Sequence, residues 1–322
     1  MTTPPDFVHL HVHSQYSILD GQASIQKLVD KAMRDGQPGI ALTDHGNMFG
    51  IKEFYNYVKK VKGKYKAQAA EAEARLAALV DGSQAPADPA EIARCRAELA
   101  DLKRKAAFKP IIGSEVYVAR RRMQDKEGKP DQSGYHLILL AKNLKGYHNL
   151  IKIVSKAWTD GFYMRPRTDR AEIEKYHEGL ICCSACLAGE IPRFLLEGNE
   201  KGALERAQMY RDIFGAESFF LEIMPNQLPE QVAVNKLIIE MARKNNFPLL
   251  ATNDAHYLNS SDYDWHELLL CVGTKKVITD PGRMSFRVND FYFRSAQEMW
   301  GYFGSEAPDS LENTLRIAER CH

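Results

Sequence analysis

Three histidines at alternate positions near the start of the chain constrain its fold most. His9, His11 and His13 alternate with aliphatic residues in residues 7–13. Alternate side chains of a β-strand share one face, so this pattern predicts a strand with imidazoles on one face and hydrocarbon on the other. An ordinary core strand would carry aliphatic residues on both faces, because a buried imidazole must satisfy two nitrogens. The strand is therefore either metal-binding or built around hydrogen-bonded structural histidines.

Length and charge set the broad class of the protein. A chain of 322 residues that is 44% hydrophobic can bury a large core. Its 43 Lys and Arg residues against 42 Asp and Glu residues give a net charge of +1, so any attraction to nucleic acid must be local. No apolar run approaches the roughly 20 residues of a membrane span, and the polar start lacks the apolar centre of a signal peptide. We expect a cytoplasmic protein without a membrane partner.

The six cysteines do not form the pattern of a secreted disulfide framework in a chain of this length. Cys183 and Cys186 have the spacing of a structural zinc site, but no second pair of Cys or His residues follows nearby. We therefore expect free thiols, one of which is available to a site assembled from distant segments.

Predicted strands and helices alternate along most of the chain. Strands are predicted at residues 7–13, 39–43, 110–118, 135–140, 179–186, 218–223 and 248–256. Helices between them are predicted at residues 25–33, 49–61, 146–157, 203–214 and 230–244. Seven strands that alternate with helices predict a parallel sheet, and this length favours a closed α/β barrel over an open doubly wound sheet.

Residues 62–109 interrupt this alternation. Apolar residues recur there at helical spacing in two runs, and Asp88 with Pro89 forms a helix start after a turn at residues 82–87. The pattern predicts an antiparallel helical hairpin with arms of about 20 residues, on the order of 30 Å long. It is either a surface insertion that packs on itself or a docking arm.

Side chains of metal-ligand type cluster at the predicted strand ends. They are His11, His13, Asp20, Asp44, His45, Glu115, His136, Cys186, Glu222, Asp254 and His256. The carboxyl ends of barrel strands converge on one face, so such a series predicts a shared site. His136 fits less well because it opens its strand. Three ligands per ion would allow two or three ions, a charge density suited to a phosphate ester.

These motifs resemble the polymerase and histidinol phosphatase (PHP) domain family. They are HVHS at residues 11–14, LDG at 19–21, TDHGN at 43–47, IGSE at 112–115, YHL at 135–137, SAC at 184–186 and ATNDAH at 251–256. The continuation MFG at 48–50, GFY at 161–163 and PR at 166–167 are similar to the amino-terminal part of bacterial DNA polymerase III alpha subunits. The similarity runs from about residue 7 to the end of the chain, with the hairpin as an interruption.

The resemblance implies a distorted seven-stranded barrel that holds two or three divalent ions, such as zinc, manganese or iron. The implied ligands are His11, His13, Asp20, His45, Glu115, His136, Cys186, Asp254 and His256. His9 and Asp44 would support these ligands rather than bind. Asp254 and His256 would carry catalysis through their ions, with metal-bound hydroxide as the nucleophile.

The implied reaction is removal of nucleotides from a DNA 3′ end, that is, proofreading. Arg120, Arg165 and Arg167 lie in predicted loops that either hold strand phosphates or are ordinary solvated loops. Residues 1–270 would form the barrel, and residues 271–322 would connect it to a polymerase palm domain. We recognise no polymerase carboxylate cluster, so we expect a fragment that cannot itself extend DNA, with other polymerase domains and replicase subunits as partners.

Three functional hypotheses follow. The chain is a metal-dependent 3′-to-5′ exonuclease module of a replicative polymerase, a small-molecule phosphatase of the histidinol phosphate type, or a metal-stabilised scaffold for the polymerase. The polymerase-like tail at residues 271–322 argues against the second hypothesis. The retention of all nine ligand types argues against a fully degenerate scaffold.

Overall fold

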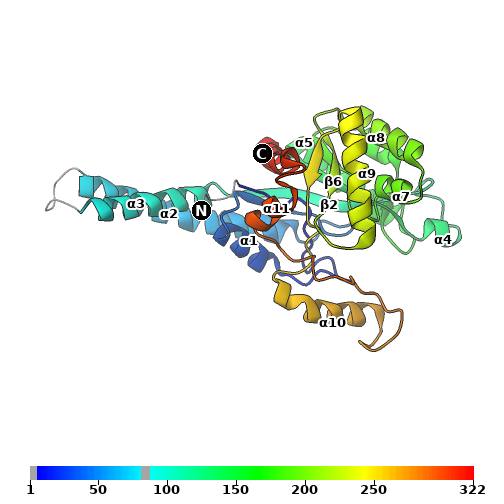
Figure 1. Ribbon diagram of the computed structural model, residues 1–322, viewed down its shortest axis with the longest axis horizontal. Helices are drawn as coiled ribbons and strands as arrows, with labels where there is room; N and C mark the ends of the chain where they lie inside the picture. Colours follow the sequence, from blue (N-terminus) through cyan, green and yellow to red (C-terminus); the bar gives the residue numbers. More distant parts are fainter. Residues whose placement is uncertain (1–5, 81–87) are drawn as a thin grey trace.

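A curled, mixed β-sheet forms the centre of the computed structural model, which describes residues 6–80 and 88–322 (Figure 1). The strands are β1 (Gly39–Leu42), β2 (Lys109–Ala119), β3 (Gly134–Ala141), β4 (Arg167–Thr168), β5 (Leu180–Cys183), β6 (Phe219–Ile223) and β7 (Leu249–Ala251). Their order is β1-β2-β3-β5-β6-β7, and β4 pairs with β2. The sheet curls into a half-barrel, which confirms the predicted α/β class.

The sheet is not purely parallel, so this part of the prediction was wrong. Strand β3 runs antiparallel to both β2 and β5, whereas β1, β4, β6 and β7 join the sheet through parallel pairs. Between β2 and β3 the chain forms only the short helix α4 (Gly128–Asp131), not the long crossover helix that parallel neighbours usually require. The beginning of β3 therefore lies at the same edge as the carboxyl ends of its neighbours.

The amino-terminal segment helps to close the half-barrel, although it is not the regular strand that its alternation predicts. His9 forms an isolated parallel bridge with Ile40, and Val12 forms another with Ala255 just after β7. The segment thus lies between the two ends of the sheet. Its aliphatic side chains enter a core shared with the strands, formed by Val8, Leu10, Ala41, Ile111, Ile138, Leu140, Ile181, Cys183, Phe220 and Leu250.

Helices cover the outer face of the sheet (Figure 1). They are α1 (Ile25–Arg34), α5 (Leu144–Thr159), α6 (Arg170–Tyr176), α7 (Glu190–Leu196), α8 (Glu200–Phe214), α9 (Pro229–Asn245), α11 (Ala296–Phe303) and α12 (Pro308–Arg320). The largest apolar cluster joins these helices, except α1, to the strands, and α1 packs in a second cluster with β1 and α2. The helices predicted at residues 25–33, 146–157, 203–214 and 230–244 are confirmed. Among the described helices, none is both long and apolar enough to cross a bilayer.

The predicted helical hairpin is an arm that projects from the half-barrel (Figure 1). It consists of α2 (Ile51–Val80) and α3 (Pro89–Ala106), and the predicted turn at 82–87 lies outside the described residues. Asp88 caps α3 by accepting a hydrogen bond from the backbone N–H of Ala90, at 2.9 Å. The first turns of α2 also pack into the main body through Phe54 and Val58.

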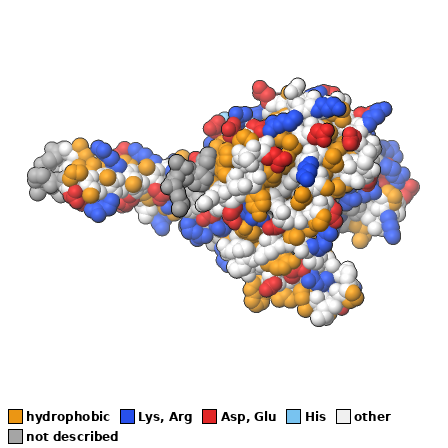
Figure 2. Space-filling view, viewed as in Figure 1, with side chains coloured by type: hydrophobic (Ala, Val, Ile, Leu, Met, Phe, Trp, Pro, Cys, Tyr) orange, Lys and Arg blue, Asp and Glu red, His pale blue; other side chains and the backbone are white. Residues whose placement is uncertain are grey.

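The two helices of the arm bury their apolar side chains against each other. Ala69 and Ala72 of α2 pack against Leu99 of α3 in a small core of their own. Lys103 pairs with Glu73 at 2.8 Å on the surface, and Figure 2 shows charged side chains of both signs along the arm. The outer part of the arm therefore satisfies its own apolar surface.

We expect the outer arm to be dispensable for the fold and for metal binding. Replacing residues 67–100 with a short glycine-rich link removes a self-contained apolar cluster and leaves the part of α2 that packs into the body. Circular dichroism should show a folded domain that is less helical, and elemental analysis should give an unchanged metal content per chain. A fall in bound metal would contradict this prediction.

The carboxyl-terminal region contains α10 (Tyr263–Thr274), which the sequence predicts, and α11, whose predicted capping box is present at Ser295 and Glu298. The strand or hairpin predicted at residues 286–293 is wrong, because only Tyr292 pairs, through an isolated bridge. Backbone hydrogen bonds around this bridge hold the segment: the N–H of His256 donates to the carbonyl of Phe291 at 2.8 Å, and the N–H of Phe293 donates to that of Tyr257 at 2.9 Å. Arg294 also donates to Asp290 at 2.6 Å.

Helix α12 packs against β7 and completes the core of the main body. Asn313 donates a hydrogen bond to the carbonyl of Leu249 at 2.8 Å, and Thr314 accepts one from the backbone of Val8 at 3.2 Å. Both contacts are buried. Residues after 270 thus include a helix that supports the amino-terminal segment carrying the histidines.

Candidate metal centre

All nine predicted metal ligands lie together at one rim of the half-barrel. His11, His13 and Asp20 come from the amino-terminal segment and its turn, and the others come from β2, from β3 or from the residues just after β1, β5 and β7. Each of the nine has a nitrogen, oxygen or sulfur atom within 4.0 Å of such an atom of another member. The structure therefore brings the full set together.

Glu115 of β2 lies at the centre of the cluster. Its Oε1 atom is 2.7 Å from His136 Nδ1 and 3.4 Å from His11 Nε2. Its Oε2 atom is 3.7 Å from His13 Nε2 and also contacts His45 Nδ1. His136 can reach this carboxylate from the beginning of its strand because β3 runs antiparallel to β2.

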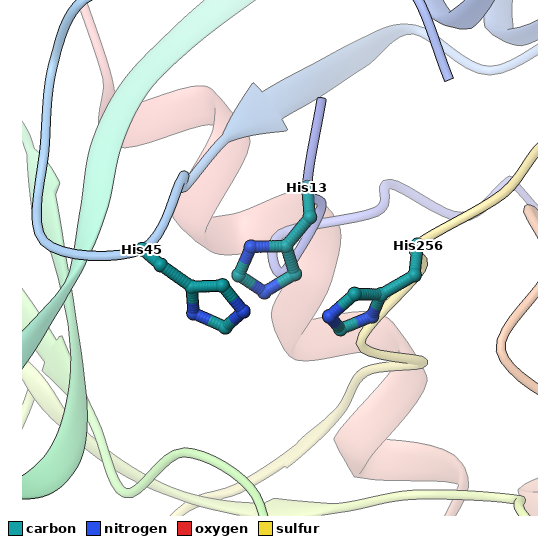
Figure 3. Close-up of side chains that lie close together, drawn as sticks. All are labelled: His13, His45 and His256. Atoms are coloured by element: carbon teal, nitrogen blue, oxygen red, sulfur yellow. The ribbon is translucent and has the colours of Figure 1, made fainter. Parts of the chain in front are cut away.

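Three overlapping groups have the geometry to hold a cation. In each group, the three ligand atoms lie within 4.8 Å of one another. The groups are His13 with His45 and His256, His11 with His13 and Glu115, and His45 with Glu115 and His136. Figure 3 shows the first group, with imidazoles from three distant parts of the chain facing a common space.

Several ligand atoms are buried without a hydrogen bond of acceptable geometry in the described structure. They are His11 Nε2, His13 Nε2, Asp20 Oδ1, His45 Nδ1, Glu115 Oε2 and Asp254 Oδ1. Buried polar atoms are normally paired, so six such atoms in one cluster need a shared partner. A set of imidazole, carboxylate and thiol donors suits divalent transition metals. The residues present therefore fit divalent metal ions.

The charges of the cluster also suit a cation. Burial disfavours the charged form of Glu115 and Asp254, but the neighbouring imidazoles outweigh it and hold the pKa of both carboxyls well below the usual range. Burial, followed by His45 and His256, lowers the pKa of His13 to about 3. At neutral pH these groups are carboxylates and a neutral imidazole, the forms that bind metal. Burial lowers the pKa of His11 and His45, but neighbouring carboxylates outweigh it and raise both well above the usual value, so metal binding would release their protons.

Two residues at the rim have left-handed backbone conformations that are uncommon outside glycine. Ala185 has φ of 62° and Asp254 has φ of 50°. Such conformations cost of order 1–3 kcal/mol each and cluster at functional sites. Here they turn the chain directly before Cys186 and at Asp254, so that both side chains face the cluster.

A sequence model of the PHP domain matches residues 9–226, which is more than half of the chain. The chain belongs to the PHP domain family. Because the match begins at His9 and includes β1 to β6, it covers seven of the nine clustered side chains. Asp254 and His256 follow the matched region and complete the rim.

Relatives of this PHP domain chain are named DNA polymerase III subunit alpha. Those from Treponema pallidum, Borreliella burgdorferi and Thermus aquaticus are 40%, 38% and 37% identical, each over 98% of this chain. The chain spans only about a quarter of their length, 22–24%. A solved structure provisionally named a metal-dependent phosphoesterase, from Bifidobacterium adolescentis, has a TM-score of 0.34 and 12% identity over 93% of this chain and 98% of that one.

The sequence analysis missed the role of Glu222, a strand-end carboxylate of β6 that it did not count among the ligands. Its Oε2 atom is 3.0 Å from His11 Nδ1 and accepts a hydrogen bond from Thr252 at 2.7 Å. Its Oε1 atom accepts from the backbone N–H of Ala185 at 2.7 Å. Glu222 thus fixes the imidazole of His11 so that Nε2 faces the cluster. The position of Glu222 at a strand end was the sequence feature that could have indicated this role.

We expect Glu222→Gln to weaken metal binding without unfolding the PHP domain. The amide keeps the size of the side chain but removes the charge that orients His11, and such supporting groups typically change metal affinity 10–100-fold. A competition titration against a chelator measures the affinity. Glu240→Gln, on the exposed face of α9, is the matched control. An unchanged affinity for Glu222→Gln would show that His11 needs no orienting carboxylate.

Asp44 contacts the cluster through the hydroxyl of a serine. Its carboxylate accepts hydrogen bonds from Ser14 and from Ser17 Oγ, the latter at 2.8 Å. Ser17 Oγ is also 3.0 Å from His13 Nδ1 and accepts a bond from the backbone N–H of His45 at 3.1 Å. Asp44 therefore acts on His13 through Ser17, a residue that the sequence did not single out.

His9 contacts residues outside the group of nine ligands. Its Nε2 atom is 2.8 Å from the carbonyl oxygen of Arg294, and its ring lies 4.1 Å from that of Phe293, between centroids. These contacts include none of the nine ligands, so the supporting role for His9 stays a prediction. Burial lowers the pKa of His9 to about 4, so it is neutral at pH 7.

The three cysteines around β5 lie in different surroundings, as strand alternation predicts. Cys182 enters the outer core, Cys183 enters the core inside the half-barrel, and Cys186 lies beyond the strand end. The Sγ atom of Cys186 is 3.6 Å from His136 Nδ1 and 3.8 Å from Glu115 Oε1. Burial, followed by nearby carboxylates, raises the pKa of this thiol well above the usual range, so its thiolate requires a neighbouring cation.

We expect Cys186→Ser to lower the metal content of the PHP domain and Cys183→Ser to leave it unchanged. Serine is a much weaker ligand than cysteine for a soft divalent ion, whereas Cys183 packs in the apolar core inside the half-barrel. Elemental analysis of the two purified variants measures the difference. Loss of metal from Cys183→Ser alone would reverse the assignment.

The three arginines predicted to bind substrate lie in different environments. The prediction that Arg167 binds substrate is wrong. Its side chain is fully buried and donates to the carbonyls of Gly161, Met123 and Asp125. Its guanidinium ties two loops together and cannot reach a substrate phosphate.

The other two arginines are at the surface. Arg120 lies over the ring of Tyr135 at 5.3 Å, away from the cavity that opens onto the cluster. Arg165 lines that cavity and lies over the ring of Tyr117 at 5.9 Å. Arg165 is exposed and forms no ion pair within residues 6–80 and 88–322. It is therefore the arginine placed to meet an anionic ligand.

Proposed function

We propose that this chain is a metal-dependent phosphodiesterase module that releases nucleotides from a DNA 3′ end. It would act as the proofreading PHP domain of a DNA polymerase III alpha subunit. The observation that carries the proposal is the cluster of nine ligand-type side chains, in which buried nitrogen and oxygen atoms without hydrogen bonds face one another. A domain that had lost its metals would have no need to keep such atoms buried without hydrogen bonds.

In this proposal the side chains of the cluster hold the metal ions, orient one another and bind the DNA strand. Divalent ions, when bound, would lower the pKa of a water molecule and neutralise charge on a phosphodiester. Glu115 and Asp254 would hold the ions with charged oxygen atoms, and Glu222 would fix His11. Asp254 and His256 stand at the cavity, where their loss would remove ion binding closest to the substrate. Arg165 would bind a phosphate of the strand.

The test begins with elemental analysis of the purified chain for zinc, manganese and iron. The metal-loaded chain is then incubated with DNA labelled at a single-stranded or mismatched 3′ end. We expect nucleotide release that a chelator stops and a divalent transition metal restores. Arg165→Gln should weaken binding of the strand, while Arg120→Gln, outside the cavity, serves as the matched control.

Two alternatives give different results in the same experiment. Hydrolysis of histidinol phosphate without nucleotide release would indicate a small-molecule phosphatase. Bound metal with no activity on either substrate would indicate a metal-stabilised scaffold. The relatives named DNA polymerase III subunit alpha support the polymerase context, in which the remaining parts of the parent chain and other replicase subunits are the proposed partners, in the cytoplasm.

A further inference from the structure

Three aromatic side chains stand in a row beside the metal centre. Phe49 precedes α2, Trp158 lies at the end of α5, and Phe162 follows α5. Ring centroids of Phe49 and Trp158 are 5.6 Å apart, as are those of Trp158 and Phe162, which are stacked at 24°. All three line the same cavity, of about 760 Å³, as the ligands His45 and Asp254. We call these three side chains the aromatic row.

The aromatic row is fixed relative to the metal centre. Trp158 Nε1 donates a hydrogen bond of 2.8 Å to the carbonyl of Gly46, the residue directly after His45. Gly46 has φ of 60°, and a Cβ atom there would lie 2.7 Å from Pro166 Cγ and 3.0 Å from Tyr117 Cε2. The turn therefore requires glycine. This turn therefore contains both the ligand His45 and, at Gly46, the carbonyl that holds Trp158.

These aromatic rings are exposed, although their size and apolar character favour burial. Phe49, Trp158 and Phe162 are 56%, 40% and 45% exposed. Contiguous exposed apolar side chains mark binding surfaces, and rings that present a face stack with nucleobases irrespective of sequence. Arg165, whose exposed guanidinium lacks an ion pair in the described ranges, lines the same cavity and complements a phosphate.

We propose that the aromatic row is a stacking surface for unpaired bases, so that the metal centre takes single-stranded or frayed 3′ ends rather than paired ones. This inference rests on the proposed function and names the substrate class of the same site. The bases next to the 3′ end would stack on Trp158 and Phe162 while the phosphodiester enters the cavity.

Burial of the ligands explains why an unpaired end is required. His11, His13, Glu115 and Asp254 are buried, so the reacting phosphodiester must enter the cavity and cannot be reached on the surface of a duplex. An end that enters must leave its stack and its partner strand, and this step is easiest for a mismatched or single-stranded end. The aromatic row replaces the lost stacking just where the strand would enter.

The test measures binding separately from hydrolysis. The metal-loaded chain is titrated with fluorescent single-stranded oligonucleotides whose terminal linkages are phosphorothioates, which resist hydrolysis. One has normal 3′ bases and another has abasic 3′ residues on the same backbone. We expect the normal strand to bind about tenfold more tightly than the abasic strand, because stacking of even one base contributes that much. A blunt duplex should bind more weakly than the normal strand.

The variant Trp158→Ala with Phe162→Ala should remove the preference for bases and leave affinity for the abasic strand unchanged. Trp158→Phe keeps a ring, should retain most of the preference, and covers the case in which the double variant fails to fold. Trp265→Ala is the matched control, because Trp265 is 66% exposed on α10 and does not line the cavity. Figure 2 shows hydrophobic side chains gathered over that helix.

Three results would overturn the inference. They are equal affinity of the wild type for normal and abasic strands, a preference that survives the double variant, and dimers that the double variant disperses without a change in DNA binding. The last result would identify the row as an interface between copies of the chain. Failure of the proposed function is separate, because it would appear as absent hydrolysis of unmodified DNA with the binding preference intact.

Discussion

Glu115→Gln is expected to abolish metal-dependent release of nucleotides and to remove at least one bound ion per chain. Glu115 belongs to two of the three groups that can hold a cation, and its two oxygen atoms reach four histidines and Cys186. The amide is nearly isosteric, but it carries no charge and turns an N–H donor toward imidazole nitrogens. Loss of the ion removes several kcal/mol of charge stabilisation, so activity should fall about a thousandfold or more.

Elemental analysis and the 3′-end assay together check this expectation. Glu267→Gln is the matched control, because Glu267 is also a buried carboxylate but pairs with Arg283 at 2.6 Å, outside the cluster. The control should keep its metal and its activity, even if its stability falls. Full metal content and activity in Glu115→Gln would show that this carboxylate is not shared between ions.

The sequence predicts the elements of the fold better than their directions. Periodicity located α1, α5, α8 and α9, and the Asp88 cap marked the start of α3. The direction of β3 could not be predicted in the same way, because a run of apolar residues is compatible with both a parallel and an antiparallel buried strand. The alternating segment at residues 7–13 also misled, since it forms isolated bridges at the closure of the sheet.

The candidate site shows the same limit. Residue type and strand-end position singled out eleven side chains, and the family resemblance selected from them the nine that lie together. His136 looked misplaced only because an all-parallel sheet was assumed. The sequence did not predict the roles of residues that act on a ligand through another residue or that bind backbone carbonyls. Glu222 acts through His11, Asp44 acts through Ser17, and Arg167 is held by backbone carbonyls of two loops. These roles arise from contacts across the fold, which no local pattern encodes.

Combining Asp254→Asn with His256→Ala is expected to abolish release of nucleotides from a DNA 3′ end while the domain stays folded. Asp254 Oδ1 is 3.1 Å from His11 Nε2 and 3.0 Å from His13 Nε2, so its charge serves the buried side of the cluster. His256 belongs to the group with His13 and His45 at the cavity. The pair therefore touches both ends of the cluster, and its loss should leave no ion able to activate water.

The matched control for this pair is Glu73→Gln on the helical arm, which breaks only the surface pair with Lys103 and should change neither metal content nor activity. Circular dichroism and elemental analysis of the double variant separate loss of metal from loss of fold. Asp254→Asn and His256→Ala alone should each retain part of the metal, because each leaves other ligands of the cluster in place. If the wild type, fully metal-loaded and free of contaminating nuclease, releases nothing from single-stranded or mismatched 3′ ends, the centre is structural. The same substitutions would then lower thermal stability in step with the metal they lose, because a bound ion stabilises the folded state.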